Sequence, residues 1–154
     1  MALQLSSPVF QPMGEIPKAH TCDGANTAPA LHWSGAPAGT KSFALIVDDP
    51  DAPDPAAPKR TFVHWVAYDL PPSTMGFTAG ADGVPGREGI NDAKGRGYTG
   101  PCPPIGRHRY FFKLYALDAV LGDLGVPTKA ELEHAMRGHI LEQAELVGTY
   151  ARAR

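Results

Sequence analysis

The segment Phe62–Leu70, which reads Phe-Val-His-Trp-Val-Ala-Tyr-Asp-Leu, decides the fold of this 154-residue chain. Alternate residues of a β-strand project to opposite faces of a sheet. The residues that would project to each face are mostly apolar: Phe62 and Val66 belong to one face and Trp65 to the other. A strand that is apolar on both sides needs cover on both sides. The segment therefore predicts a central strand in a sheet that is packed on both faces.

Further strands are predicted on either side of this one, and 17 glycines and 16 prolines favour a strand-built, loop-rich domain over a helical one. The other predicted strands are Leu3–Phe10, Ala30–Trp33, Ser42–Asp48, Arg109–Asp118 and Glu142–Ala151. Between the central strand and Arg109 lies a long loop, Pro71–Pro104, in which only Ser73–Phe77 has a pattern that would suit a helical turn. Such a long loop in a compact domain indicates function or disorder. Because its end carries the segment Gly100-Pro101-Cys102-Pro103-Pro104, we interpret it as one wall of a site.

One helix is predicted near the C-terminus. Thr128-Lys129-Ala130-Glu131 has the sequence of a capping box, and apolar residues then recur every three or four positions from Leu132 to Ile140. The chain is short enough to form a single domain, residues 1–154. We therefore predict a mainly-β sandwich of antiparallel or mixed sheets with one clear helix near the C-terminus.

The segment Asp49-Pro50-Asp51-Ala52-Pro53 follows a predicted strand and holds two carboxylates. Residues i and i+2 of an extended chain project to the same side, so Asp49 and Asp51 are expected to face one space. Two neighbouring carboxylates are costly unless cations or hydrogen-bond donors meet them, and His64 and His108 are the candidates. Tyr110 lies two residues after His108 and is expected on the same face. Arg109 faces the other way and is expected to form a structural ion pair.

These segments, in this order and spacing, resemble the phosphatidylethanolamine-binding protein family. The resemblance runs from about Thr21 to Arg152 and is closest to the short bacterial branch that is often called Raf-kinase-inhibitor-like. The segments that carry it are Asp49–Pro53, His64-Trp65-Val66, Gly100-Pro101, His108-Arg109-Tyr110, Thr21-Cys22-Asp23-Gly24, Leu31-His32-Trp33-Ser34-Gly35, Gly138-His139-Ile140-Leu141 and Ala144-Glu145-Leu146.

The resemblance implies a β-sandwich with a small anion pocket and favours a cis peptide bond between Ala52 and Pro53. The implied ligands are phosphate, phosphorylated headgroups and similar small anions. A protonated phosphate, whose second pKa is about 6, can donate to a carboxylate while it accepts from histidine and from loop N–H groups. This is binding without catalysis, and no cofactor and no bound metal are implied. The expected ligand-binding residues are Asp49, Asp51, His64, Gly100, Pro101, His108 and Tyr110.

Composition excludes several other classes of protein. A net charge of −2 without a basic block argues against nucleic acid as a partner. The apolar stretch Phe43–Val47 is far too short to span a bilayer, and Met1–Gln11 does not have the pattern of a signal peptide. A cytoplasmic location is therefore expected, and on that ground Cys22 and Cys102 are expected to be free thiols.

Two other classes of function stay open beside the binding of a small anion. One is a protein-interaction module that inhibits a kinase or a protease, for which the sequence identifies no partner. The other is a hydrolase that uses the Asp and His residues for metal binding or for general acid–base chemistry. A homodimer is also an open alternative.

Overall fold

The computed structural model describes residues 2–80 and 84–152 and folds into two antiparallel sheets. The larger sheet has the order β6-β4-β3-β7-β8 and the smaller has the order β1-β2-β5. The strands are β1 Gln4–Ser6, β2 Leu31–Ser34, β3 Ser42–Ala52, β4 Arg60–Leu70, β5 Gly76–Phe77, β6 Arg87–Glu88, β7 His108–Leu117 and β8 Ile140–Tyr150. A short 3-10 helix, η1, covers Lys18–His20, and the α-helix, α1, covers Lys129–Met136.

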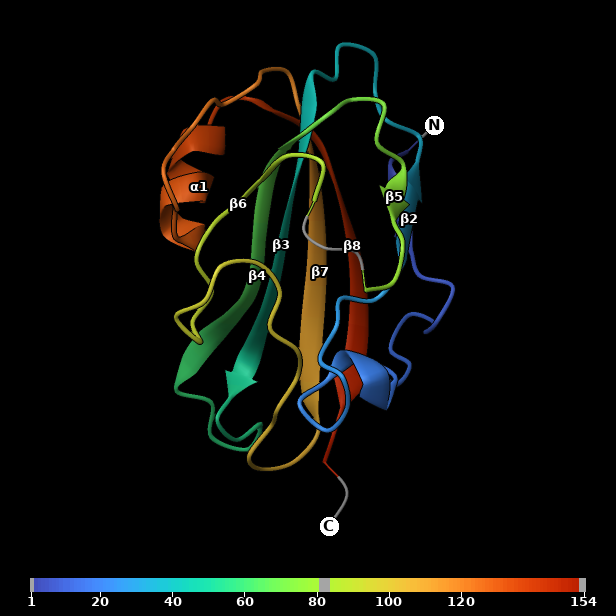
Figure 1. The fold of residues 1–154 in the computed structure, drawn as a ribbon, viewed down its shortest axis with the longest axis vertical. Coiled ribbons are helices and arrows are strands. Elements are labelled where there is room, and N and C mark those ends of the chain that lie inside the picture. The colour runs from blue at the N-terminus through green and yellow to red at the C-terminus, as the bar shows by residue number, and fades with distance from the viewer. Residues whose placement is uncertain (1, 81–83, 153–154) are drawn as a thin grey trace.

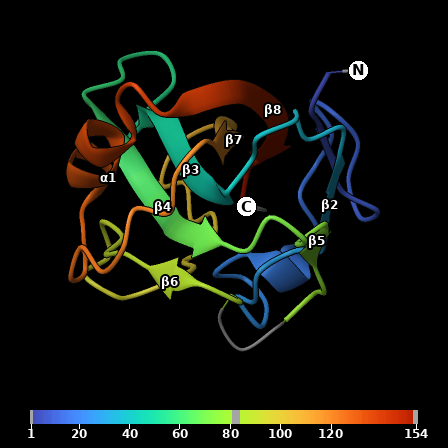
Figure 2. The ribbon, with the colours of Figure 1, turned by 90° about the horizontal axis from the view of Figure 1, so that it is seen from above.

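The molecule has three layers. Figure 2 shows α1 on one side of the large sheet and the small sheet with β2 and β5 on the other side. The strand β4 is therefore covered on both faces, as its sequence predicts, and the mainly-β sandwich with one α-helix is confirmed.

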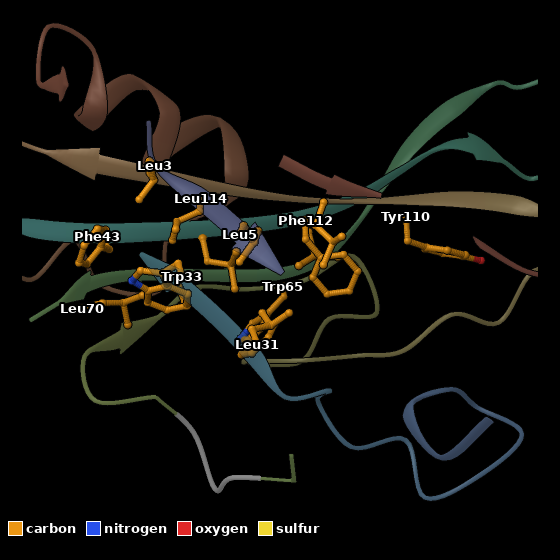
Figure 3. Close-up of a cluster of buried hydrophobic side chains, with 14 of the residues drawn as sticks. Leu3, Leu5, Leu31, Trp33, Phe43, Trp65, Leu70, Tyr110, Phe112 and Leu114 are labelled. Carbon is orange, nitrogen blue, oxygen red and sulfur yellow. The ribbon is translucent and has the colours of Figure 1, made fainter. Parts of the chain in front are cut away.

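Two apolar clusters fill the spaces between the layers. The larger one lies between the sheets, and Figure 3 shows Trp33, Phe43 and Trp65 within it. The smaller one lies under α1, where Leu132 is completely buried against Ile46 and Val66.

Several element boundaries differ from the predictions. The strand β1 ends at Ser6 instead of Phe10. Helix α1 ends at Met136, whereas the predicted helical pattern continued to Ile140. The helix stops because Gly138 adopts a φ of +83°, a conformation that glycine reaches without strain. Ile140 is already the first residue of β8. The helical turn predicted at Ser73–Phe77 is wrong, since Gly76 and Phe77 form β5 against β2. Of the long loop Pro71–Pro104, residues 81–83 lie outside the described residues.

Candidate functional site

Three segments meet at one end of the large sheet and, together with Cys22 from the loop after η1, enclose a pocket of about 440 Å³. The end of β3, the start of β4 and the loop that leads into β7 gather at the lower end of the sheet in Figure 1. The residues that line the pocket are Cys22, Asp49, Ala52, Pro53, Arg60, Phe62, His64, Ala93, Thr99, Gly100, Cys102, Pro103, Pro104, His108 and Tyr110. Of the seven residues predicted to bind a ligand, the lining therefore includes five and omits Asp51 and Pro101.

His64 reaches the pocket through an irregularity in the pairing of β3 with β4. Val47 pairs with Trp65, whereas the next residue, Asp48, pairs with Val63, so that His64 is the extra residue of a β-bulge. The bulge lets His64 face the pocket while Trp65 packs in the core between the sheets. Simple alternation had assigned His64 and Trp65 to opposite faces, and it did not anticipate the bulge.

The hydrogen bond that His64 makes fixes its tautomer. Its Nδ1 lies 2.8 Å from the backbone oxygen of Thr99. A carbonyl oxygen can only accept, so Nδ1 carries the proton and donates, and Nε2 of the neutral ring has a free lone pair. Burial lowers the pKa of His64, against the opposing effect of the Thr99 carbonyl, and so favours the neutral ring. The side chain thus offers the pocket a hydrogen-bond acceptor.

His108 and Asp49 form a buried pair on the floor of the pocket. The Nε2 of His108 lies 2.8 Å from the carbonyl oxygen of Ile105 and 3.1 Å from that of Pro53, so it must carry a proton. The Nδ1 lies 2.6 Å from Oδ2 of Asp49, and one further proton must lie in this contact. Whichever atom holds that proton, the two side chains together have no net charge. Both nitrogens of His108 are used within the protein, so we assign His108 a positioning role.

Tyr110 supplies a hydroxyl without a partner. Its side chain is stacked on the His108 ring and meets the His64 ring edge-on, with ring centroids 6.3 Å and 5.2 Å apart. The hydroxyl oxygen is buried and makes no hydrogen bond to the described residues. Burial, assisted by the nearby Asp49, raises the pKa of Tyr110, so the group remains a hydroxyl that can donate. Figure 3 shows the hydroxyl pointing away from the core cluster.

Asp51 does not face the same space as Asp49, contrary to the expectation from alternation. The pairing of β3 with β4 shifts register between Asp49 and Ala52, which turns the intervening backbone. The Asp51 carboxylate lies against Arg109, 2.9 Å from its backbone nitrogen, 3.0 Å from Nε and 2.8 Å from Nη2. These bonds to Arg109 hold the pKa of Asp51 below its usual value. Arg109 forms the structural ion pair that the sequence predicted, and its partner is Asp51.

Gly100 and Pro101 join the pocket wall to the loop after η1. The N–H of Gly100 donates to Oδ1 of Asn26 at 2.8 Å, and the oxygen of Pro101 accepts from the N–H of Cys22 at 3.1 Å. A Cβ on Gly100 would collide with the backbone oxygen of His20, so glycine is needed here for contact between two loops. The N–H of Gly100 is thus used within the protein, and Gly100 stays a predicted ligand-binding residue that lines the pocket. The Ala52–Pro53 peptide is cis, as the resemblance suggested.

The prediction that Cys22 and Cys102 are free thiols is wrong. They form a disulfide with their Cα atoms 5.4 Å apart, and both line the pocket. The prediction used only the expected compartment. It could not account for the contact between the two loops, which the bonds from Gly100 and Pro101 create. The cytoplasmic location, from which the free thiols were inferred, remains a prediction.

Sequence reasoning missed four residues that shape the site. Thr99 fixes the tautomer of His64, and Pro53 contributes a carbonyl to His108. Phe62 forms an apolar wall, and the Arg60 guanidinium lies 5.1 Å from the centre of its ring. Arg60 and Phe62 precede His64 on one strand, so their alternation with it was the available signal. The Thr99 contact has no such signal because it is made by a backbone atom.

Two findings concern metals and membranes. Within residues 2–80 and 84–152, no three His, Cys, Asp or Glu side chains are grouped so that they could hold a metal ion. Helix α1, like η1, is too short to cross a bilayer, and the described part of the chain contains no helix that could do so.

Comparison with known proteins identifies the family. The profile of the phosphatidylethanolamine-binding protein family matches residues 6–151. The UPF0098 protein of Methanothermobacter thermautotrophicus is 44% identical over 97% of this chain and 99% of its own length. The crystal structure of a phosphatidylethanolamine-binding protein homologue from Chlamydia trachomatis has 42% identity and a TM-score of 0.93, and covers 99% of both chains. YbcL from Escherichia coli has 28% identity and a TM-score of 0.83, over 99% of this chain and all of that one. The chain therefore belongs to the phosphatidylethanolamine-binding protein family.

Proposed function

We propose that the pocket binds a small phosphate monoester through its singly protonated phosphoryl group. One observation carries the proposal: the free Nε2 acceptor of His64 and the unpartnered hydroxyl of Tyr110 belong to side chains in direct contact within one pocket. A group that satisfies both must donate to the imidazole and also accept from the hydroxyl. A monoprotonated phosphate does both. A carboxylate or a sulfate accepts only, and an ammonium group donates only.

The charge of the pocket supports an anionic ligand. Asp49 forms a pair of zero net charge with His108, and Asp51 is paired with Arg109. Neither carboxylate is therefore left to repel a phosphate. The side chain of Arg60, about half exposed, lies at the pocket and is held only loosely by Asp92, 3.5 Å away. Its guanidinium supplies a positive charge that a phosphate can reach.

The size and lining of the pocket support a ligand larger than inorganic phosphate. A volume of about 440 Å³ lies in the range of small-molecule sites. Phe62, Pro53, Pro103 and Pro104 make much of the wall apolar. We propose that the organic part of the ester packs against this wall. The name of the family, which refers to a phosphorylated headgroup, agrees with this class of ligand.

Calorimetric titration with phosphoethanolamine between pH 5.5 and pH 8 tests the proposal. The affinity is expected to fall as the pH rises, because the second phosphate proton is lost with a pKa of about 6. His64 does not cause this change, since its lowered pKa keeps it neutral over most of the range. A sulfate monoester, which has no proton to donate, should bind much more weakly at every pH. Affinity that rises with pH, or equal affinity for the sulfate ester, would contradict the proposal.

Two substitutions test the proposed donor and acceptor. Tyr110→Phe and His64→Gln should each weaken the binding of phosphoethanolamine about tenfold, the effect of one hydrogen bond of about 1.4 kcal/mol. The matched controls are Tyr115→Phe, on the opposite face of the sheet under α1, and His139→Gln, an exposed residue paired with Asp118. Both controls should bind normally. Tyr110→Phe should not destabilise the free protein, because its hydroxyl has no partner to lose.

The location in the cytoplasm, the inhibition of a kinase or protease and the hydrolase activity stay predictions from sequence. The pairing of Asp49 with His108 occupies both of these side chains, so neither is free to take a proton from a substrate as a general base.

A further inference from the structure

The Cys22–Cys102 disulfide forms part of the pocket wall, in a position where a reductant can reach it. Both residues line the pocket, and Cys102 is exposed. Cleavage of a disulfide requires that a thiolate attack one of its sulfur atoms, so access to that sulfur controls the reaction. The bond joins segments 80 residues apart in the sequence and fastens the loop before β7 to the loop after η1.

Other contacts of this wall lie on both sides of Cys102. Before it, the hydroxyl of Tyr98 donates to the oxygen of His20, and the N–H of Gly100 donates to Asn26. The oxygen of Pro101 accepts from the N–H of Cys22. After it come Pro103 and Pro104, which have no N–H to donate, and then Ile105, whose oxygen accepts from His108. The disulfide therefore holds the middle of the wall, between two anchored ends.

The strands that carry the polar floor of the pocket are paired with one another without the disulfide. Asp49 lies on β3, His64 on β4, and His108 and Tyr110 on β7, three neighbouring strands of one sheet. Opening the disulfide would leave these strands paired and would loosen the wall, which includes the carbonyl groups of Thr99 and Ile105 that bond to His64 and His108. The affinity for a ligand can thus change without loss of the fold.

We propose that the disulfide is a reducible lock on the ligand pocket, with tight binding in the oxidised protein and weaker binding in the reduced protein. This rests on the proposed function. A dithiol reductant supplies two electrons and two protons: the Cys22–Cys102 bond breaks, both residues become thiols, and the reductant becomes a disulfide. In the reduced protein the wall must be ordered when the ligand binds. Ordering one or two residues corresponds to an affinity that is about tenfold weaker.

Ligand binding must in turn affect the reduction of the disulfide. If oxidation strengthens ligand binding about tenfold, the bound ligand protects the disulfide against reduction by the same factor. For this two-electron couple the factor equals a reduction potential about 30 mV more negative at saturating ligand. Ligand supply would then influence the thiol state of the protein, as the thiol state influences ligand binding.

Calorimetric titration with phosphoethanolamine at pH 6 tests the lock on oxidised protein, on protein reduced with dithiothreitol and on the Cys22→Ser, Cys102→Ser double variant. The reduced protein and the double variant should bind about tenfold more weakly than the oxidised protein, and dithiothreitol should have no effect on the double variant. Equal affinity in the oxidised and reduced forms would overturn the lock and leave the proposed function intact.

Hydrogen exchange followed by mass spectrometry gives a readout that needs no ligand. Reduction should speed exchange in residues 98–105 and 18–27 and leave β3, β4 and β7 unchanged. If no form binds phosphoethanolamine, the proposed function fails, and unchanged exchange in 98–105 would separately overturn the lock. Two free thiols in protein purified in air, without reductant and without a thiol-blocking reagent, would also overturn it.

Discussion

At the residue scale, the two carboxylates of the Asp49-Pro50-Asp51 segment have different roles because each meets a different partner side chain. Asp49 accepts from the N–H of Asp51 through Oδ1, at 2.7 Å, and meets His108 through Oδ2. This use of the carboxylate on its own backbone is typical of an Asx turn. It directs the chain so that Asp51 leaves the pocket and reaches Arg109, where it fixes the backbone at the start of β7.

The substitution Asp51→Asn is therefore expected to lower stability and to leave ligand binding nearly unchanged. The carboxylate is buried and accepts three hydrogen bonds from Arg109, and loss of its charge should cost about 1–3 kcal/mol of the free energy of unfolding. Chemical denaturation measures the loss, and titration with phosphoethanolamine measures the affinity. Glu15→Gln, in an exposed ion pair with Arg107, is the control and should change the stability little.

The same substitution has a defined pH dependence. The bonds from Arg109 lower the pKa of Asp51 in the folded protein below its pKa in the unfolded chain, which is about 3.9. The Asp51 carboxylate therefore contributes to the free energy of unfolding above that pH, and the contribution is lost as the pH falls through the pKa of the folded protein. The difference between the two proteins should thus shrink in acid. If Asp51→Asn lowered the affinity strongly without lowering the stability, Asp51 would have to contact the ligand, as the sequence predicted.

At the element scale, β4 connects the helix-covered face of the sheet with the pocket. Val63 and Val66 pack under α1. His64, the extra residue of the bulge between them, faces the pocket. Helix α1 therefore supports the strand that holds the proposed acceptor. The capping box predicted from the sequence is present: Glu131 N–H donates to Oγ1 of Thr128 at 3.1 Å, and Thr128 N–H donates to Oε1 of Glu131 at 2.9 Å.

Removal of this cap should loosen the helix without altering the site directly. Thr128→Ala is expected to lower the free energy of unfolding by about 1 kcal/mol, because the N–H of Glu131 loses its partner. Glu131→Gln is the matched control, since glutamine can complete a capping box and should cost only a few tenths of a kcal/mol. Thermal unfolding measures both losses, and a loss for Thr128→Ala that is no larger than the loss for Glu131→Gln would contradict the prediction.

Local sequence patterns predicted the long elements well and the irregular ones poorly. The strands β3, β4, β7 and β8 have strong apolar patterns, and each was predicted to within four residues at either end. The two-residue strands β5 and β6 were missed because their structure depends on pairing with β2 and β4, which no local pattern records. The bulge at His64 was missed for a similar reason, since it is a property of two paired strands.

At the scale of the whole molecule, the site exists because the sandwich brings distant segments together. The resemblance to a known family, more than any local pattern, indicated that Asp49, His64, His108 and Tyr110 belong together, and all four line one pocket. The resemblance did not predict the Cys22–Cys102 disulfide or the departure of Asp51. The disulfide depends on a contact between two loops, and the departure of Asp51 depends on its contact with Arg109 on another strand, so both are set by tertiary packing that the sequence does not display.

The burial of neutral His64 should make the stability of the whole protein sensitive to mild acid. Burial lowers the pKa of the folded histidine, so below about pH 6.5 the unfolded chain binds a proton that the folded protein does not. Stability contributed by the neutral ring is full above that pH and is lost as the pH falls, at up to about 1.4 kcal/mol per pH unit. This loss continues until the folded pKa is reached.

Comparison of the wild type with His64→Gln isolates this effect from the other histidines. Glutamine can still donate to the oxygen of Thr99 but cannot titrate, so the free energy of unfolding of the variant should depend less on pH between 6.5 and 5. Urea denaturation at half-unit steps of pH measures both curves. His139→Gln, which changes an exposed histidine, should follow the wild type. Parallel curves for wild type and His64→Gln would mean that the folded protein accommodates a charged His64. The site would then present a donor to its ligand, and the predicted preference for a protonated phosphate over a sulfate would disappear with it.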